Sequence, residues 1–229
     1  MAPSARKRPQ QPRAKETVRA ILEATTQILD RESLEAATTT RIAEVAGVSI
    51  GSLYQYFSHR DAILDALQDR EFERTMAVMQ TVFAEGNLDK APLETVTAAL
   101  RGLAHLYAQS PGLHRVLAIE GLRVAKAERV QAFDLRVIEL VRHFLMAARA
   151  PLRVNNVEAA AFIIFQSVRA TMLAHLLERP PGLDVDGLVE ELTGFLTGYV
   201  LGGATPAPSA VNSRRTPRKP KRARSPSRA

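Results

Sequence analysis

The chain has 229 residues, of which 46% are hydrophobic and none is cysteine, so disulfides, thiolate metal sites and a cysteine redox switch are excluded. No apolar run approaches the ~18 residues of a membrane span, and the basic N-terminus precedes no signal-peptide core, so we expect a cytoplasmic protein. Residues 1–13 and 204–229 hold 12 of the 31 basic residues and no acidic residue, which leaves 19 basic against 24 acidic residues, a net charge of −5, on residues 14–203.

Both ends of the chain are rich in Pro, Ser, Arg and Ala and lack apolar periodicity. Such segments cannot bury enough apolar surface to offset the entropy that is lost on ordering. We therefore expect a disordered basic arm over residues 1–13 and a disordered basic tail over residues 204–229.

The part between the ends shows apolar residues at helical spacing in segment after segment, and no strand-like alternation. The expected fold class is therefore all-α, with about nine helices. The first helix ends near Arg31 and buries one stripe, which consists of Val18, Ile21, Leu22, Ile28 and Leu29.

Two short helices are expected next. The first is capped by the threonines at positions 38–40 and stopped by Gly47, and the second is capped by Ser49 and runs to about Phe57. Four longer helices are then expected near residues 59–83, 93–109, 111–123 and 126–149, where proline and glycine mark most of the breaks.

The last two helices are the most apolar. One has a stripe of Ala161, Ile164, Phe165, Val168, Met172 and Leu176, and the other has Leu188, Leu192, Phe195, Leu196 and Tyr199. Because these faces are wider than one neighbour covers, we expect a helical hairpin that pairs with its copy as a four-helix bundle in a homodimer. Gly194 and Gly198 each cost about 1 kcal/mol of helix propensity, which suggests a close backbone crossing, with fraying of the terminal helix as the alternative.

The stretch TTRIAEVAGVSIGSLYQYF, residues 39–57, has the spacing of a helix-turn-helix. Two helices that cross near a right angle need a small residue at their contact, a turn residue that tolerates left-handed backbone, and an apolar anchor on the second helix. Ala43, Gly47 and Leu53 supply these in order. The exposed start of the second helix can then enter a DNA major groove.

The pattern I-A-x-x-A-G-V-S-x-G-x-L-Y-x-Y-F, followed by a basic residue and an acid-apolar-apolar run, resembles the TetR family of bacterial regulators over residues 17–65. It departs from the family pattern at Arg60, where lysine is usual, and in having His59 before it. The resemblance implies a DNA-binding head over residues 14–64, and a divergent helical domain for dimerisation and ligand binding over residues 65–203.

The resemblance also implies which residues contact DNA: Thr39, Thr40, Ser49, Ile50, Gly51, Ser52, Tyr54, Gln55, Tyr56, His59 and Arg60. The two threonines bond phosphate from one side, and Tyr56 and Arg60 do so from the other. Residues 50–52 and Gln55 face the bases, with Gly51 allowing a close approach of the backbone.

Some of these residues also have a purely structural interpretation. Tyr54, Tyr56 and Phe57 can be core aromatics, and Ser49 can be a helix cap alone. We expect Phe57 to be a core residue and Ser49 to have both roles. We expect the two tyrosines to contact DNA, because hydroxyl groups at a helix surface need polar partners.

The predicted head holds five basic and seven acidic residues, so it lacks the positive charge expected of a DNA-binding module. We therefore expect Arg6, Lys7, Arg8 and Arg13 of the arm to lie in the adjacent minor groove or along phosphates. The C-terminal tail is either a nonspecific tether to DNA or a solubilising segment.

The second domain is expected to hold a small-molecule effector in a mostly apolar pocket with a few polar groups. Candidate ligand-binding residues are those unusual on apolar helical faces: His105, Tyr107, His143, Phe144, Phe162, Gln166, Arg169, Met172 and His175. For each of them a core or surface role is the alternative. Gln166 and Arg169 are the preferred pair, since a buried arginine needs an anionic partner, which is the ligand, Glu120 or Glu139.

The sequence has no phosphate-binding glycine loop, nucleophile elbow or metal-ligand spacing, so we expect no enzyme, metal site or cofactor. It predicts a homodimer that binds double-stranded DNA at a palindromic operator and is released by an unidentified small molecule, most simply as a repressor. An architectural or occlusion-type DNA-binding protein without a ligand is the alternative. A helical interaction scaffold without DNA binding is a third possibility.

Overall fold

The computed structural model describes residues 12–84, 91–148 and 152–202. Within these ranges the chain forms nine α-helices and no strand, which confirms the all-α fold class. The predicted tail and most of the predicted arm lie outside the described residues. The last two residues of that arm, Pro12 and Arg13, already belong to the first helix, because proline is well suited to the first helical turn.

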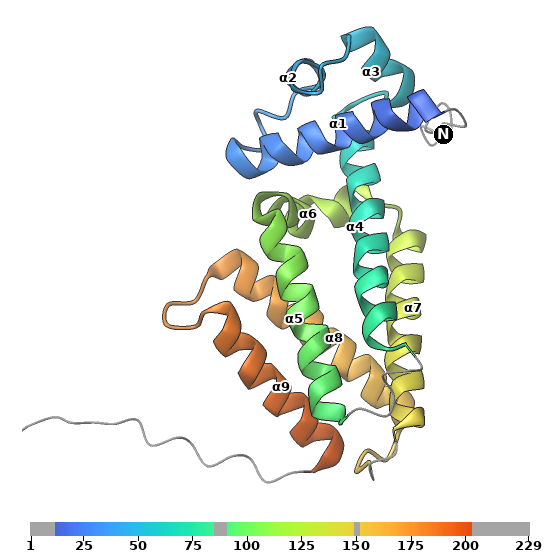
Figure 1. Ribbon diagram of the computed structural model, residues 1–229, viewed down its shortest axis with the longest axis vertical. Helices are drawn as coiled ribbons and strands as arrows, with labels where there is room; N and C mark the ends of the chain where they lie inside the picture. The colour runs from blue at the N-terminus through green and yellow to red at the C-terminus, as the bar shows by residue number, and fades with distance from the viewer. Residues whose placement is uncertain (1–11, 85–90, 149–151, 203–229) are drawn as a thin grey trace, which may run out of the picture.

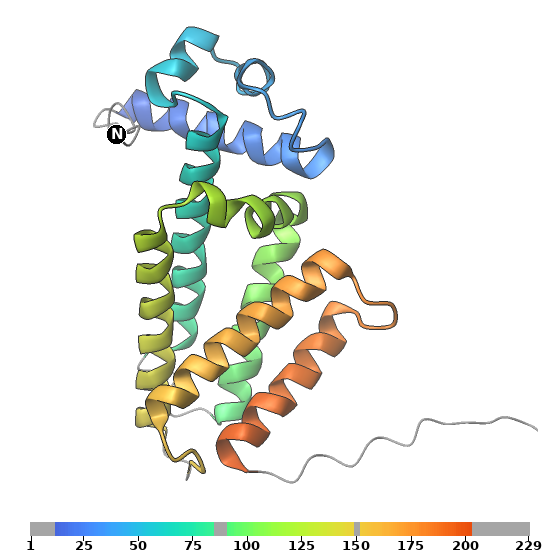
Figure 2. The ribbon, with the colours of Figure 1, turned by 180° about the vertical axis from the view of Figure 1, so that it is seen from behind.

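The helices agree with the predicted ones to within a few residues. They are α1 (Pro12–Arg31), α2 (Thr39–Val45), α3 (Ile50–Tyr56), α4 (Arg60–Val82), α5 (Pro92–Gln109), α6 (Pro111–Val124), α7 (Ala127–Ala147), α8 (Val157–Glu178) and α9 (Val185–Leu201). Figure 1 shows α1, α2 and α3 as a head at one end, from which α4 runs into a larger helical body. In both views α6 lies between the head and the other helices of the body (Figures 1 and 2).

The turn between α2 and α3 has the features that the motif predicts. Thr38 and Ser49 cap α2 and α3, each accepting a hydrogen bond from a backbone N–H in the first turn. Gly47 has a φ of +66°, a left-handed conformation that strains other residues. Ala43 and Leu53 are buried, so the two helices meet as the motif requires.

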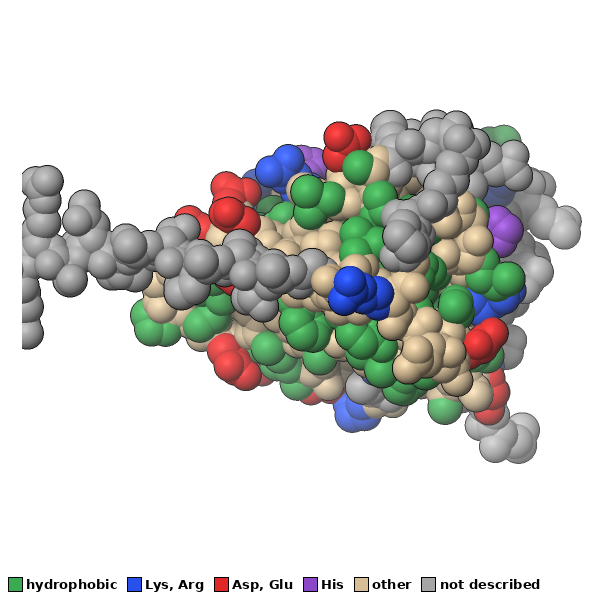
Figure 3. Space-filling view, turned by 90° about the horizontal axis from the view of Figure 1, so that it is seen from below, with side chains coloured by type: hydrophobic (Ala, Val, Ile, Leu, Met, Phe, Trp, Pro, Cys, Tyr) green, Lys and Arg blue, Asp and Glu red, His purple; other side chains and the backbone are tan. Residues whose placement is uncertain are grey.

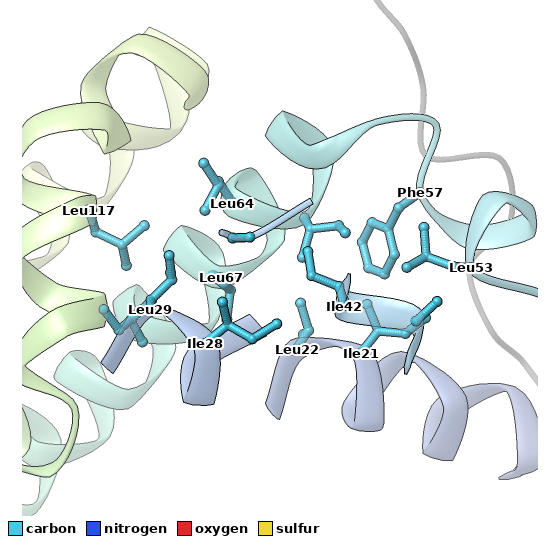
Figure 4. Packing of buried hydrophobic residues seen from close by; sticks show 14 residues of the cluster. Ile21, Leu22, Ile28, Leu29, Ile42, Leu53, Phe57, Leu64, Leu67 and Leu117 are labelled. Atoms are coloured by element: carbon cyan, nitrogen blue, oxygen red, sulfur yellow. The ribbon is translucent and has the colours of Figure 1, made fainter. Parts of the chain in front are cut away.

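The core of the head extends into the body. Figure 4 shows side chains from α1 to α4 pointing toward one another, among them Ile21 and Ile42, and Leu117 of α6 lies against the same cluster. Leu67 of α4 and Leu113 of α6 are fully buried in this cluster too. The packing therefore crosses the boundary that was predicted at residue 64, and the head rests on α6 as well as being continuous with α4.

The two apolar helices α8 and α9 pack on different neighbours. α8 packs mainly on α7, and α9 packs mainly on α5, so the two share little contact. Leu100 and Leu103 of α5 pack in one cluster with Met172 of α8 and Leu188 of α9, so α5 supplies much of the core on which the two helices rest. Each helix thus buries only its inner side within one chain.

The outer sides of α8 and α9 remain apolar and exposed. The exposed large residues on them are Phe162, Ile163, Leu177, Val185, Phe195 and Tyr199. A Cβ added at Gly194 or Gly198 would meet no atom within 4 Å. Figure 3 views the end of the molecule opposite the head and shows hydrophobic side chains gathered among charged ones. These helices therefore present surface that nothing in the described chain covers.

By length and composition alone α8 is apolar enough to cross a membrane, contrary to the expectation that no segment reaches this length. The helix is this apolar because few of its 22 residues are charged. One such helix is weak evidence for a span, since the core helices of folded proteins have the same composition. The contacts of α8 with α7 and α6 are those of a helix in a bundle.

Candidate nucleic-acid interface and ligand cavity

The exposed side of α3 carries the residues that were predicted to face DNA bases. Ile50, Gly51 and Gln55 are exposed and Ser52 is half-buried. Leu53 faces the other way and anchors α3 in the head core, where it is fully buried. The start of α3 is therefore anchored in the head core while its outer side is open to a partner.

A polar surface forms where α3 meets the starts of α2 and α4. The Tyr54 hydroxyl lies 3.1 Å from Thr39 Oγ1, within hydrogen-bond distance. Ser58, His59 and Arg60 line the same shallow depression, together with Asp61, whose carboxylate pairs with arginines. Hydroxyl, imidazole and guanidinium groups that gather in this way can donate hydrogen bonds to phosphate oxygens.

His59 and Arg60 also have partners within the protein. His59 Nδ1 accepts a hydrogen bond from the backbone N–H of Ala62 at 3.2 Å, so in the neutral ring Nε2 carries the proton. Arg60 Nη1 donates to the Leu34 carbonyl oxygen at 3.3 Å, and its Nε lies 3.8 Å from Asp61 Oδ1. These contacts fix both side chains at the edge of the depression.

The remaining predicted DNA-binding residues differ in burial. Thr40 and Ser49 are exposed, and Ser49 acts as the predicted helix cap. Tyr56 is half-buried against the head core. Phe57 is 5% exposed, which confirms that it is a core residue. The contacts of the others with DNA stay predictions.

A cavity of about 450 Å³ lies in the body, bordered mainly by α4 to α8. Its walls are mostly apolar and include the stacked rings of Phe72 and Phe133, whose centroids are 4.2 Å apart. The polar residues that line it are Gln68, Glu71, Thr75, Tyr107, His114, Asp134, Gln166 and Arg169. A concave apolar site with a few polar groups is what small-molecule binding requires.

Glu71 of α4 is a buried carboxylate in the cavity wall, only 4% exposed. Arg70 Nε donates to its Oε1 and Arg74 Nη1 donates to its Oε2, each at 3.1 Å. Burial favours the neutral acid, but His114, Arg74 and Arg70 together outweigh it and hold the pKa of Glu71 below its ordinary value. Glu71 is therefore charged at neutral pH.

Three hydrogen bonds connect α4 and α6 to the head. Arg70 Nη2 donates to Thr26 Oγ1 of α1 at 2.9 Å. Asp30, near the end of α1, accepts hydrogen bonds on Oδ1 from the backbone N–H groups of Gly112 at 2.7 Å and Leu113 at 3.0 Å. These groups belong to the first turn of α6, so Asp30 caps α6 from a position 82 residues away in sequence.

Arg169 of α8 is engaged by neighbours within the body. Its Nη1 donates to Asp134 Oδ2 at 2.8 Å and its Nη2 donates to Gln166 Oε1 at 2.7 Å. Burial raises the pKa of Asp134, and the nearby Arg169 only partly offsets that effect. Neither Glu120 nor Glu139 is the partner of Arg169, because each pairs with an arginine one turn along its own helix.

The structure gathers four of the nine predicted ligand-binding residues. Tyr107, Gln166, Arg169 and Met172 line the cavity. Phe144 is buried in a different cluster, and the half-buried His175 donates from Nε2 to the Leu183 carbonyl oxygen at 3.0 Å. The exposed residues are His105, His143 and Phe162. Ligand contact stays a prediction for all nine.

Glu71 and His114 are cavity residues that the sequence analysis missed. Glu71 continues the buried stripe of α4 that Ile63 and Leu67 define, at steps of four residues. His114 lies one turn before the buried Leu117 on α6. An ionisable side chain at a core position of a helix was the available signal, since perturbed groups of this kind gather at functional sites.

We expect Glu71→Gln to lower the free energy of unfolding at neutral pH by about 2 kcal/mol, because it leaves Arg70 and Arg74 beside a neutral amide. The folded-state pKa of Glu71 is lowered, so its stabilisation is present above the ordinary value of 4.5 and is lost as the pH falls through the folded-state pKa. Urea unfolding of wild type and variant at neutral and acidic pH measures this difference.

The control for this prediction is Glu73→Gln, which changes an exposed carboxylate of the same helix. We expect it to change the free energy of unfolding by less than about 0.5 kcal/mol at either pH. If the loss in free energy of unfolding caused by Glu71→Gln is the same at neutral and acidic pH, the stabilising role of the Glu71 charge is contradicted.

Two family models match the chain. The model described as "Bacterial regulatory proteins, tetR family" matches residues 21–67, which include the helix-turn-helix. The model described as "Tetracyclin repressor-like, C-terminal domain" matches residues 92–199, which include most of the body. Together the two matches span more than half of the chain.

Similar proteins are known from curated sequences and from solved structures. Nucleoid occlusion factor SlmA of Actinobacillus pleuropneumoniae is 31% identical over 104 residues, 45% of this chain and 50% of that protein, so the chain spans about half the length of this curated relative. The fatty acid degradation regulator FadR of Bacillus halodurans is 18% identical, with a TM-score of 0.63 over 82% of this chain and 96% of that one.

A third similar protein is FadR of Thermus thermophilus, a TetR-family repressor solved in complex with lauroyl-CoA. It is 22% identical, with a TM-score of 0.59 over 84% of this chain and 99% of that one. At such identities the two solved structures show the fold alone. The family models, the fold and the helix-turn-helix head together show that the chain belongs to the TetR family of DNA-binding transcriptional regulators.

Proposed function

We propose that the protein is a ligand-responsive repressor, which binds a palindromic operator as a homodimer and is released by a small molecule. The observation that carries this proposal is the place of the cavity, whose wall includes Glu71 of α4 and His114 of α6. α4 is continuous with the head and α6 supports it. A ligand that binds two arrangements of these helices with different affinities shifts the population of the head positions.

In the proposed complex α3 lies in the major groove. The surface formed by Thr39, Tyr54, His59 and Arg60 holds phosphate, and the basic arm supplies the positive charge that the head lacks. The two heads of a dimer contact successive major grooves, ~34–36 Å apart, on one side of the duplex. The protein acts in the bacterial cytoplasm, on the nucleoid when it is bound to DNA.

We expect Gly51→Ala to weaken operator binding by about tenfold while the fold stays intact. The added Cβ meets only Ser49 Oγ, at an ordinary contact distance of 3.8 Å, and alanine gains about 1 kcal/mol of helix propensity over glycine. At the DNA surface the same methyl group separates the α3 backbone from the base edges. Fluorescence anisotropy with operator DNA measures the affinity, and thermal unfolding checks the fold.

A variant that is at least as stable as wild type and binds the operator equally well would show that the backbone at Gly51 does not approach DNA closely. The matched control is Gly121→Ala, which lies in α6 away from α3. Its Cβ meets the end of the flexible Gln68 side chain, which can move aside.

Dimerisation through α8 and α9 is supported by their exposed apolar sides. Phe162 and Phe195 are each more than half exposed, which is costly for aromatic side chains in water. The open backbone at Gly194 and Gly198 allows a second helix to approach α9 closely. A four-helix bundle made by two copies covers these surfaces.

The first test of the proposed function is capture of genomic DNA fragments by the purified protein, followed by footprinting at several salt concentrations. A short palindromic footprint protected by a dimer supports the proposal, and the neighbouring genes then guide the choice of ligands. Diffuse protection that disappears as salt is raised contradicts a specific operator. The lauroyl-CoA complex of the Thermus thermophilus neighbour supports a small-molecule effector for the cavity.

An occlusion-type or architectural DNA-binding protein is the second candidate function. The similarity to Nucleoid occlusion factor SlmA, 31% identity over about half of that protein, favours it. The two functions differ in the number of genomic sites and in their response to ligand. Many sites whose occupancy no cavity-binding compound changes would favour occlusion over repression.

A further inference from the structure

One buried polar atom in the cavity wall lacks a hydrogen-bond partner. The His114 side chain is only 7% exposed, and its Nδ1 donates to the Ser110 carbonyl oxygen at 2.9 Å. Its Nε2 has no hydrogen-bond partner in the described part of the chain. The nearest charged atom, Glu71 Oε2, is 3.5 Å away and outside hydrogen-bond geometry. Since buried polar atoms are nearly always paired, this nitrogen is poised for a partner that enters the cavity.

Tyr107 of α5 lies beside His114 and lines the same cavity. The centroids of the two rings are 4.7 Å apart. Burial raises the pKa of Tyr107, which keeps the hydroxyl neutral and able both to donate and to accept a hydrogen bond. A phenol hydroxyl and an imidazole therefore lie side by side in a mostly apolar wall.

The charged groups of the cavity wall are already matched. Among the described residues that line the cavity, only Arg169 carries a permanent positive charge. Its guanidinium group donates hydrogen bonds to Asp134 and Gln166. The Glu71 carboxylate is matched by Arg70 and Arg74. An anionic ligand would meet no unengaged arginine, and His114 faces the Glu71 carboxylate at 3.5 Å. A cationic ligand would compete with two arginines for Glu71. Burying an unmatched charge is costly.

We infer that the cavity takes an uncharged, mostly apolar molecule whose hydroxyl or carbonyl oxygen hydrogen-bonds to Tyr107 and His114. This inference rests on the proposed function, because it names the chemical class of the effector. A ligand hydroxyl can accept from the Tyr107 hydroxyl and share a second hydrogen bond with His114 Nε2, so it satisfies both groups at once. A ligand carbonyl accepts from the Tyr107 hydroxyl.

The experiment uses the full chain and the uncharged fluorescent dye N-phenyl-1-naphthylamine as a reporter of cavity occupancy. The competitors are 1-decanol, decanoate and decyltrimethylammonium, which share an alkyl chain and differ in charge. We expect decanol to displace the dye at a concentration at least about tenfold lower than either ion, since an ion must be buried without a free counter-charge. Displacement by either ion at an equal or lower concentration would overturn the inference.

Variants locate the polar contact. We expect Tyr107→Phe to weaken displacement by decanol about tenfold and His114→Gln to weaken it to a similar extent, while the affinity of the apolar dye changes less than about twofold. Arg101→Gln, on the exposed side of α5 and outside the cavity lining, is the matched control and leaves both values unchanged. A merely structural role of Tyr107 or His114 would lower the affinities for dye and decanol together, and this outcome also overturns the inference.

The outcomes separate this inference from the proposed function. If the dye binds and an ion displaces it best, the cavity is still a ligand site, but an uncharged effector is excluded. If neither the dye nor any competitor binds, both this inference and the proposed ligand-responsive function are contradicted. Binding of decanol without any effect on operator affinity supports the ligand class and contradicts ligand-responsive repression by that compound.

Discussion

Gly112→Ala is expected to destabilise the protein by about 3 kcal/mol, although alanine is the better helix former. A Cβ at this position would lie 2.2 Å from the Leu29 carbonyl oxygen and 2.6 Å from Asp30 Cα. Both are backbone atoms that cannot rotate away, so α1 and α6 must separate. Separation stretches the hydrogen bonds from the N–H groups of Gly112 and Leu113 to Asp30. Urea unfolding measures the loss of stability.

The matched control is again Gly121→Ala, an identical change in the same helix. Its added Cβ meets the flexible end of Gln68 rather than backbone, so we expect a change smaller than about 1 kcal/mol. Because the head rests on α6, Gly112→Ala should also reduce the effect of a cavity ligand on operator affinity. Equal stability of the two variants would contradict the close contact between α1 and α6.

Phe195→Glu is expected to convert the dimer to a monomer and to weaken operator binding by about a hundredfold or more, because one head makes only half of the DNA contacts. Phe195 is 56% exposed at the middle of the apolar side of α9. A carboxylate there would be buried without a partner in the proposed four-helix bundle. Sedimentation equilibrium gives the mass, and anisotropy gives the affinity for DNA.

Leu135→Glu is the control for this change. Leu135 is exposed to the same degree, 58%, but lies on α7. We expect this variant to remain a dimer with wild-type affinity for the operator. A Phe195→Glu protein that still sediments as a dimer would place the interface elsewhere than on α8 and α9.

The helices could be predicted from sequence because their signals are local. Ser49 caps the helix that follows it, and Gly47 permits the turn that precedes it, so neighbouring residues alone define α2 and α3. The cap of α6 could not be found in this way. Asp30 supplies it from 82 residues away, and no spacing rule relates the two positions.

The cavity was predicted only in part, for a related physical reason. Helical periodicity shows which residues are unusual on a face but not which neighbouring helix covers that face. Tyr107, which lines the cavity, and His105, which is exposed, therefore looked alike in the sequence. Glu71 was missed because hydrogen bonds from Arg70 and Arg74, with His114 of α6 nearby, make its burial tolerable, and these neighbours become visible only in the fold.

The shared core of head and body limits how DNA specificity can be exchanged between proteins of this kind. A head cut out after residue 64 would leave behind Leu67, Leu113 and Leu117, which complete its core, together with the α6 turn that Asp30 caps. The head is thus not a transferable module, and a chimera would also need the residues of α6 that pack against the head. Retargeting this regulator to a new operator should accordingly succeed through substitutions at exposed α3 positions such as Gln55, which leave the buried anchor Leu53 in place.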